Sequence, residues 1–136
     1  MVNAAESVQD THLLRVVVVD SRPERRQLVR HLVESTGLAA PDIGEASSTA
    51  EAVELIDHGG GQSVAVVEIQ MPVNQGMETI AALRNCSSGV RIVVCSFEHD
   101  PAIKERALAQ GADAYLDKPV SSLTLREVLG QYTSDS

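Results

Sequence analysis

Three runs of apolar, mostly β-branched residues dominate the hydrophobic pattern of the chain and predict buried strands. They span Arg15–Val19, residues 64–69 and residues 90–95. The apolar residues in each run are continuous and do not alternate with polar ones, which is typical of strands covered on both faces. We therefore expect a parallel sheet, and shorter segments at residues 43–46 and 114–116 bring the predicted strands to five.

Between the strand runs, apolar residues recur at helical spacing. Leu28, Val29, Leu32 and Val33 form one such stripe, and Pro23 precedes them where the first turn of a helix tolerates proline. The same pattern predicts helices over residues 25–34, 49–57, 76–84, 101–110 and 122–132. Alternation of this kind indicates an α/β fold, a doubly wound five-stranded parallel sheet with five helices.

The composition restricts the classes of partner. Eleven Lys and Arg against nineteen Asp and Glu leave a net charge of −8, and aromatic residues make up only 2% of the chain. A surface of this charge repels nucleic-acid phosphates and anionic lipid, and base-stacking platforms need several aromatic rings. We therefore expect neither a nucleic acid nor a membrane as a partner.

Length and processing signals predict one cytoplasmic domain. The 136 residues suffice for one hydrophobic core, assigned to residues 13–132, with flexible tails at residues 1–12 and 133–136. No apolar stretch approaches the length of about 20 residues that spans a bilayer, and the first residues lack the pattern of a signal peptide. Two cysteines do not form a disulfide framework.

Candidate chemistry gathers where the predicted strands end. In an open α/β sheet, ligands bind outside the carboxyl ends of the strands, near the point where the strand order reverses. The residues at these ends are Asp20, Ser21, Glu68, Ser96, Phe97 and Lys118. We expect two carboxylates, a hydroxyl group and an ammonium group to converge in one crevice.

This arrangement resembles the receiver domain of two-component response regulators, of the chemotaxis-regulator type, over residues 13–129. The matching segments are VVVVDSRP at 16–23, VEIQMP at 67–72, VVCS at 93–96, GADAYL at 111–116 and DKP at 117–119. The resemblance implies the flavodoxin-like (receiver) topology. It also implies that Ser96 and Tyr115 occupy the switch positions and that Lys118 is the lysine of the family's site.

The chain departs from the family at three positions of that site. The aspartate pair that holds Mg²⁺ in the family reads Asp20-Ser21 here, and the phosphoacceptor aspartate falls on Glu68. The residue after the switch hydroxyl is usually small but is Phe97 here, so we expect it to narrow the entrance and block the pocket. Each change opposes phosphotransfer.

The chemical effect of these changes follows from charge and reach. Mg²⁺ prefers anionic oxygen ligands, and Ser21 supplies a neutral one. Glu68 places its carboxylate about 1.5 Å farther from the backbone, and a misplacement of about 1 Å can reduce a rate on the order of 100-fold. We expect Mg²⁺ binding to be weak or absent, with Asp20 and Glu68 as the only weak ligands, and neither a cofactor nor a catalytic residue.

The sequence thus predicts an atypical, stand-alone receiver, or pseudo-receiver, that is not an enzyme and acts by protein–protein interaction. By resemblance, its contact face lies near Lys104, Arg106, Tyr115 and Arg126, with Tyr115 as an anchor on the surface. In this interpretation the conformation is independent of phosphorylation at Glu68. One hypothesis within this interpretation is that Glu68 mimics the charge of a phosphorylated aspartate and holds an active-like state.

Other interpretations stay open at this stage. The chain could be phosphorylated on another acceptor, such as Ser96, Ser21 or Asp20, or on Glu68 itself. A small enzyme or ligand-binding domain could use the same crevice. Single residues also have plain structural roles, because Glu68 could pair with Lys118 for stability and Asp20 could cap the following helix.

Overall fold

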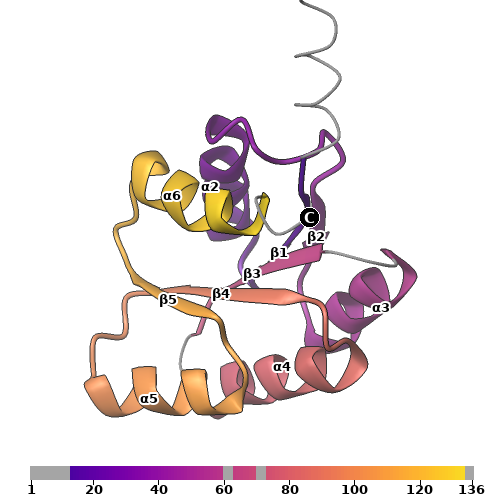
Figure 1. Cartoon of the computed structure of the whole chain (residues 1–136). Coiled ribbons are helices and arrows are strands. Elements are labelled where there is room, and N and C mark those ends of the chain that lie inside the picture. The colour runs from indigo at the N-terminus through magenta and orange to yellow at the C-terminus, as the bar shows by residue number, and fades with distance from the viewer. Residues whose placement is uncertain (1–12, 60–62, 70–72, 134–136) are drawn as a thin grey trace, which may run out of the picture.

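The computed structural model describes residues 13–59, 63–69 and 73–133, and its centre is a five-stranded parallel sheet (Figure 1). The strands lie in the order β2-β1-β3-β4-β5. Their bounds are β1 (Arg15–Val19), β2 (Gly44–Ala46), β3 (Ser63–Val67), β4 (Arg91–Ser96) and β5 (Ala114–Asp117). Every neighbouring pair is parallel, as the continuous apolar runs predicted.

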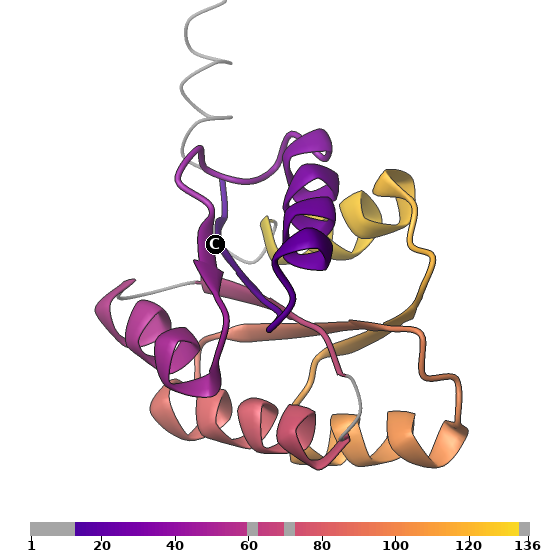
Figure 2. The same ribbon diagram turned by 180° about the vertical axis from the view of Figure 1, so that it is seen from behind.

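Five helices cover both faces of the sheet. Their bounds are α2 (Pro23–Ser35), α3 (Thr49–Gly59), α4 (Val73–Cys86), α5 (Pro101–Gln110) and α6 (Ser122–Thr133). Helices α2 and α6 lie together on one face, and α3, α4 and α5 lie side by side on the other (Figures 1 and 2). This arrangement confirms the predicted doubly wound α/β fold.

The sheet divides the hydrophobic core into two clusters because successive side chains of a strand point to opposite faces. In β1, Val17 and Val19 pack in the cluster that includes residues of α3, α4 and α5. The intervening Val16 and Val18 pack in the cluster that includes residues of α2 and α6. Both clusters consist almost entirely of aliphatic side chains, as the low aromatic content required.

The ends of the elements differ from the prediction in a few places. Helix α4 begins at Val73, earlier than the predicted residue 76, because residues 73–75 carry no apolar repeat that would reveal a helix. Thr133 was assigned to a tail, but it is the last residue of α6. The predicted tails at residues 1–12 and 134–136 lie outside the described residues.

No helix among the described residues is both long enough and apolar enough to cross a membrane.

Candidate functional site

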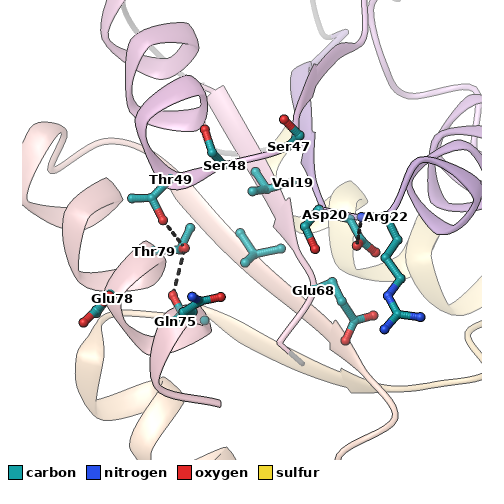
Figure 3. A pocket seen from close by; sticks show the side chains of 13 residues that line it. Val19, Asp20, Arg22, Ser47, Ser48, Thr49, Glu68, Gln75, Glu78 and Thr79 are labelled. Carbon is teal, nitrogen blue, oxygen red and sulfur yellow. Dashed lines mark hydrogen bonds between the residues drawn. The ribbon is translucent and has the colours of Figure 1, made fainter. Parts of the chain in front are cut away.

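The site lies where the order of the strands reverses. From β1 the chain goes to β2 on one side and then to β3 on the other, so the carboxyl ends of β1 and β3 flank the switch point. Asp20 follows β1 and Glu68 follows β3, and the Glu68 amide donates a hydrogen bond of 3.1 Å to the Val19 carbonyl. Both carboxylates line a polar crevice of about 370 Å³, called here the acidic crevice (Figure 3).

The far wall of the acidic crevice is rich in hydroxyl groups, which the sequence analysis did not identify. Thr49 at the start of α3 and Thr79 of α4 share a hydrogen bond of 2.6 Å between their hydroxyl oxygens (Figure 3). Thr79 also contacts the Gln75 carbonyl at 3.0 Å. Ser47 and Ser48 complete this wall. A Ser-Ser-Thr sequence is an ordinary helix start, so nothing in the sequence distinguished it as part of a site.

Asp20 is buried and is held by its own turn. Its Oδ1 accepts a hydrogen bond of 2.9 Å from the Arg22 amide and lies 3.3 Å from Arg25 Nη2. Its Oδ2 is buried with no hydrogen-bond partner among the described residues. The residue at the N-cap of α2 is Arg22, so Asp20 shapes the turn before the helix and is not its cap.

Glu68 and Lys118 form a buried ion pair. Lys118 Nζ lies 2.5 Å from Glu68 Oε1, and their side chains are 9% and 3% exposed. The two groups form an ion pair, but their geometry is not that of a hydrogen bond. Among the described residues, neither carboxylate oxygen of Glu68 accepts a hydrogen bond. Burial raises the pKa of Glu68 above its ordinary value, because it disfavours the ionised carboxylate more than Lys118 stabilises it.

Ser96, one of the two predicted switch residues, is fully buried and bonded to the backbone. Its hydroxyl donates a hydrogen bond of 2.7 Å to the Ile69 carbonyl and accepts one of 3.0 Å from the Glu98 amide. Ser96 therefore links the end of β3 to the loop that follows β4.

Tyr115, the other predicted switch residue, is buried rather than a surface anchor, which corrects that expectation. It is only 9% exposed and packs in the cluster on the α5 side of the sheet. Its hydroxyl donates a hydrogen bond of 2.6 Å to the Glu98 carbonyl. Ser96 and Tyr115 thus both form hydrogen bonds with the backbone of Glu98, in the loop that follows β4.

Phe97 lies outside the lining of the acidic crevice, so the structure does not support its predicted role of blocking that pocket. It is 57% exposed, and its ring lies over Lys118 with 5.5 Å between Nζ and the ring centroid. Side chains alternate along β4: Val94 packs on the α3–α4–α5 face and Cys95 on the α2–α6 face. Since Phe97 lies two residues after Cys95, it turns to the α2–α6 face as well.

On that face Phe97 lines a second hollow, called here the apolar groove, which the sequence analysis missed. It has a volume of about 340 Å³ and lies between α2 and the segment that connects β5 to α6. Its apolar walls include Leu28, Leu32, Phe97, Val120 and Leu125. Leu28 and Val120 are far apart in the sequence, so only the folded chain reveals the groove.

The donor set fits Mg²⁺ poorly. Three carboxylates line the acidic crevice, those of Asp20, Glu68 and Glu78, but Glu78 lies on the far side of it from the other two (Figure 3). Beside Asp20, Ser21 supplies a neutral oxygen in place of a further carboxylate. Asp20 and Glu68 each already face a cation, Arg25 or Lys118, so these four charged groups sum to zero. Across the described ranges, no group of three or more His, Cys, Asp or Glu side chains is placed to hold a metal ion.

The residues assigned to the contact face flank the edge strand β5. Lys104 and Arg106 are exposed on α5, and Arg126 is exposed on α6. The two helices lie on opposite faces of the sheet (Figure 1). The assigned residues therefore lie on two helices that cover opposite faces of the sheet.

The strand order, the helices on both faces and the acidic crevice at the switch point define a receiver-type flavodoxin-like domain. Comparison with known proteins identifies the family: the response regulator receiver domain profile matches residues 16–130, and the chain belongs to this family. Receiver domains are modules of two-component signalling.

Individual relatives agree with this assignment. The chain is 33% identical over 119 residues to the nitrate/nitrite response regulator protein NarL of Escherichia coli, covering 85% of this chain and 53% of that protein. It is 26% identical over 115 residues to the chemotaxis protein CheY of Halobacterium salinarum, covering 85% and 92%. The chain spans about half the length of the NarL proteins it matches.

A solved structure shows the same fold. The signal receiver domain of the putative response regulator NarL from Mycobacterium tuberculosis superposes with a TM-score of 0.74 at 29% identity. The match covers 91% of this chain and 98% of that one.

Proposed function

We propose that this chain is a receiver that acts through protein–protein contact and does not depend on phosphorylation of residue 68. The observation that carries the proposal is the buried ion pair between Glu68 and Lys118. By resemblance to the family, these two positions would hold a phosphoryl group between them. Here the carboxylate and the ammonium group already meet each other.

Three physical effects would reduce the rate of phosphotransfer at this site. The glutamate carboxylate extends about 1.5 Å farther than an aspartate carboxylate would, which spoils in-line attack. Lys118 is paired with Glu68, so phosphoryl oxygens would have to displace that carboxylate before Lys118 could offset their charge. The zero net charge of the four groups gives a divalent cation little electrostatic attraction.

The alternative is a receiver that is phosphorylated on another residue, and the surroundings of the candidate acceptors do not support it. Ser96 is fully buried and its hydroxyl is engaged with two backbone groups. Asp20 is buried beside Arg25. Ser21 is exposed and lines the acidic crevice, but among the described residues its hydroxyl makes no hydrogen bond to a base that would activate it.

In this proposal the signalling conformation is set by something other than phosphorylation of Glu68. Glu68 places a negative charge next to Lys118 without any phosphodonor, while Ser96 and Tyr115 hold the loop after β4 through Glu98. The contact face is assigned to the region of Lys104, Arg106, Tyr115, Arg126 and Glu127. Its basic side chains would pair with acidic groups of a partner.

Mass measurement tests the independence from phosphorylation. Intact protein is incubated with acetyl phosphate and Mg²⁺, and we expect no phosphoryl mass on the wild type. The double variant Ser21→Asp, Glu68→Asp restores the third carboxylate and shortens the acceptor, so it should gain one acid-stable, base-labile group at position 68. Because Phe97 lies outside the acidic crevice, adding Phe97→Ala should not increase labelling.

A wild type that labels readily at Glu68 would overturn the proposal. A double variant that is folded and binds Mg²⁺ but stays unlabelled would show that ligand count and reach are not the cause.

Charge reversal tests the contact face. Partners captured from native lysate by the wild type should be lost with Lys104→Glu and with Arg126→Glu. The control His58→Glu adds negative charge on α3, away from β5, and should retain them. Loss with the control, or retention with both β5-side variants, would contradict the assigned face.

A further inference from the structure

Two ion pairs form the wall between the acidic crevice and the apolar groove. One joins Asp20 to Arg25, and the other joins Glu68 to Lys118. Both carboxylates line the acidic crevice, whereas both cations line the apolar groove. The wall therefore presents anions on one side and cations on the other.

The charge of the groove contrasts with that of the whole chain. Its charged or protonatable basic lining residues are Arg25, His31 and Lys118, and no carboxylate is among its lining residues. The chain as a whole has a net charge of −8. In addition, Arg25 Nε is a buried donor without a hydrogen-bond acceptor among the described residues. An unpaired donor of this kind is costly, which an anionic acceptor nearby would relieve.

We propose that the apolar groove binds a small amphipathic carboxylate, an aliphatic or aromatic acid. Its hydrocarbon part would pack on Leu28, Leu32 and Val120, and its carboxylate would lie against Arg25 and Lys118. The volume of about 340 Å³ is in the range of small-molecule sites, which combine apolar walls with a few polar groups. Charge complementarity is what selects an anion over a neutral or cationic amphiphile.

Binding at this site would also act on the acidic crevice. The ligand carboxylate would compete with Glu68 for Lys118 and with Asp20 for Arg25, because each cation lines the groove and is paired with a carboxylate of the acidic crevice. This coupling rests on the proposed function, since it supplies an input that replaces phosphorylation. Binding itself does not require that function, so a failure of either can be recognised separately.

The experiment titrates octanoate into the labelled full chain and follows backbone amide signals by NMR. We expect saturable shifts concentrated on α2, Phe97, Lys118 to Val120 and Leu125. Two probes with the same hydrocarbon chain serve as controls: 1-octanol is neutral and octylammonium is cationic. Loss of a charge-assisted contact should weaken 1-octanol binding at least about tenfold relative to octanoate, and octylammonium further.

Two exposed leucines give a matched pair of variants. Leu28→Asp places a negative charge on the groove wall and should weaken octanoate binding about tenfold. Leu108→Asp places the same charge on α5, on the other face of the sheet, and should leave binding unchanged. Both positions are exposed, 64% for Leu28 and 42% for Leu108, so both variants are expected to fold.

A third variant tests the coupling. Glu68→Gln removes the competing carboxylate and should strengthen octanoate binding severalfold. No saturable octanoate binding, equal binding of all three probes, or equal weakening by Leu28→Asp and Leu108→Asp would each overturn the proposal. Octanoate binding that is unaffected by Glu68→Gln would overturn the coupling. Phosphorylation of the wild type in the mass experiment would contradict the proposed function without affecting this result.

Discussion

The acidic crevice and the apolar groove are two hollows of similar volume, about 370 and 340 Å³, with opposite linings. Both lie at the carboxyl end of the sheet, where receiver domains would place their chemistry. Hydroxyl and carboxylate groups line the first, and leucine, valine and phenylalanine side chains line much of the second. The comparison shows that two salt bridges can present anions to one hollow and cations to its neighbour.

The two salt bridges are not equivalent. Glu68 and Lys118 are both nearly inaccessible, whereas Arg25 is 21% exposed and Asp20 has a second partner in the Arg22 amide. We therefore expect the wall to depend more strongly on Lys118 than on Arg25. Four predictions test this view, beginning with the largest effect.

Removing Lys118 should have the largest effect on stability. Lys118→Met leaves Glu68 buried without a counter-charge, and breaking a buried pair in this way reduces the free energy of unfolding by about 3 kcal/mol. Urea unfolding at neutral pH measures the loss. The double variant Glu68→Gln, Lys118→Met should recover most of it, since no isolated charge remains. A single variant as stable as the wild type would show that the pair does not hold the wall.

The next effect concerns the floor of the acidic crevice at Gly76. A Cβ atom at this position would lie 2.9 Å from Ile69 Cγ1 and 3.2 Å from Ile69 Cα, which is too close. Gly76→Ala should therefore reduce the free energy of unfolding by about 2 kcal/mol through overpacking. Gly89→Ala is the control, because a Cβ there meets nothing within 4 Å. Equal losses in the two variants would contradict this explanation.

Removing Arg25 should have a smaller effect than removing Lys118. Arg25→Met is expected to reduce the free energy of unfolding by about 1 kcal/mol, because Asp20 keeps its hydrogen bond from the Arg22 amide and Arg25 is partly exposed. The same urea experiment compares the two variants. A loss as large as that of Lys118→Met would mean that the two salt bridges contribute equally.

The smallest effect is on the pH dependence of stability. The pKa of Glu68 in the folded chain lies above its ordinary value of 4.5, so the folded state binds this proton more tightly than the unfolded state. The contribution of Glu68 to stability is fully present below pH 4.5 and is lost as the pH rises through the raised pKa. Gln does not titrate. The free energy of unfolding of the wild type, measured by urea unfolding relative to Glu68→Gln, should therefore fall from acidic to neutral pH. A rise over this range would contradict the prediction.

Much of the fold could be predicted from the sequence, because it depends on local patterns. The strand at Arg15–Val19 and the helix at Pro101–Gln110 have the predicted bounds. Asp20 and Glu68 were expected in one crevice and both line it, because the carboxyl ends of parallel strands meet at one edge of the sheet. Lys118 was expected there too, but it pairs with Glu68 from the side of the apolar groove, and Ser96 lines neither hollow. These inferences needed only residue periodicity and the order of the elements.

The details of the site needed the three-dimensional arrangement. Tyr115 is buried, and the sequence left both a surface and a core position open, since a tyrosine at a strand edge can face either way. The face of the sheet to which Phe97 turns follows from the alternation of side chains along Val94, Cys95 and Ser96. The strand pattern in the sequence already contains this signal. The apolar groove could not be inferred, because it depends on how closely α2 approaches the end of β5.

The lengths of the strands affect how the folded chain behaves when it is stored or concentrated. The two outer strands are the shortest, with three residues in β2 and four in β5, and Pro119 follows β5 closely. The valine-rich segments Arg15–Val19 and Ser63–Val67 are the kind that assembles into amyloid, but each is paired on both sides within the sheet. Short edges leave little backbone for another chain to extend. Fibril formation should therefore require prior unfolding, and variants such as Lys118→Met should form thioflavin-positive aggregates at lower temperatures than the wild type.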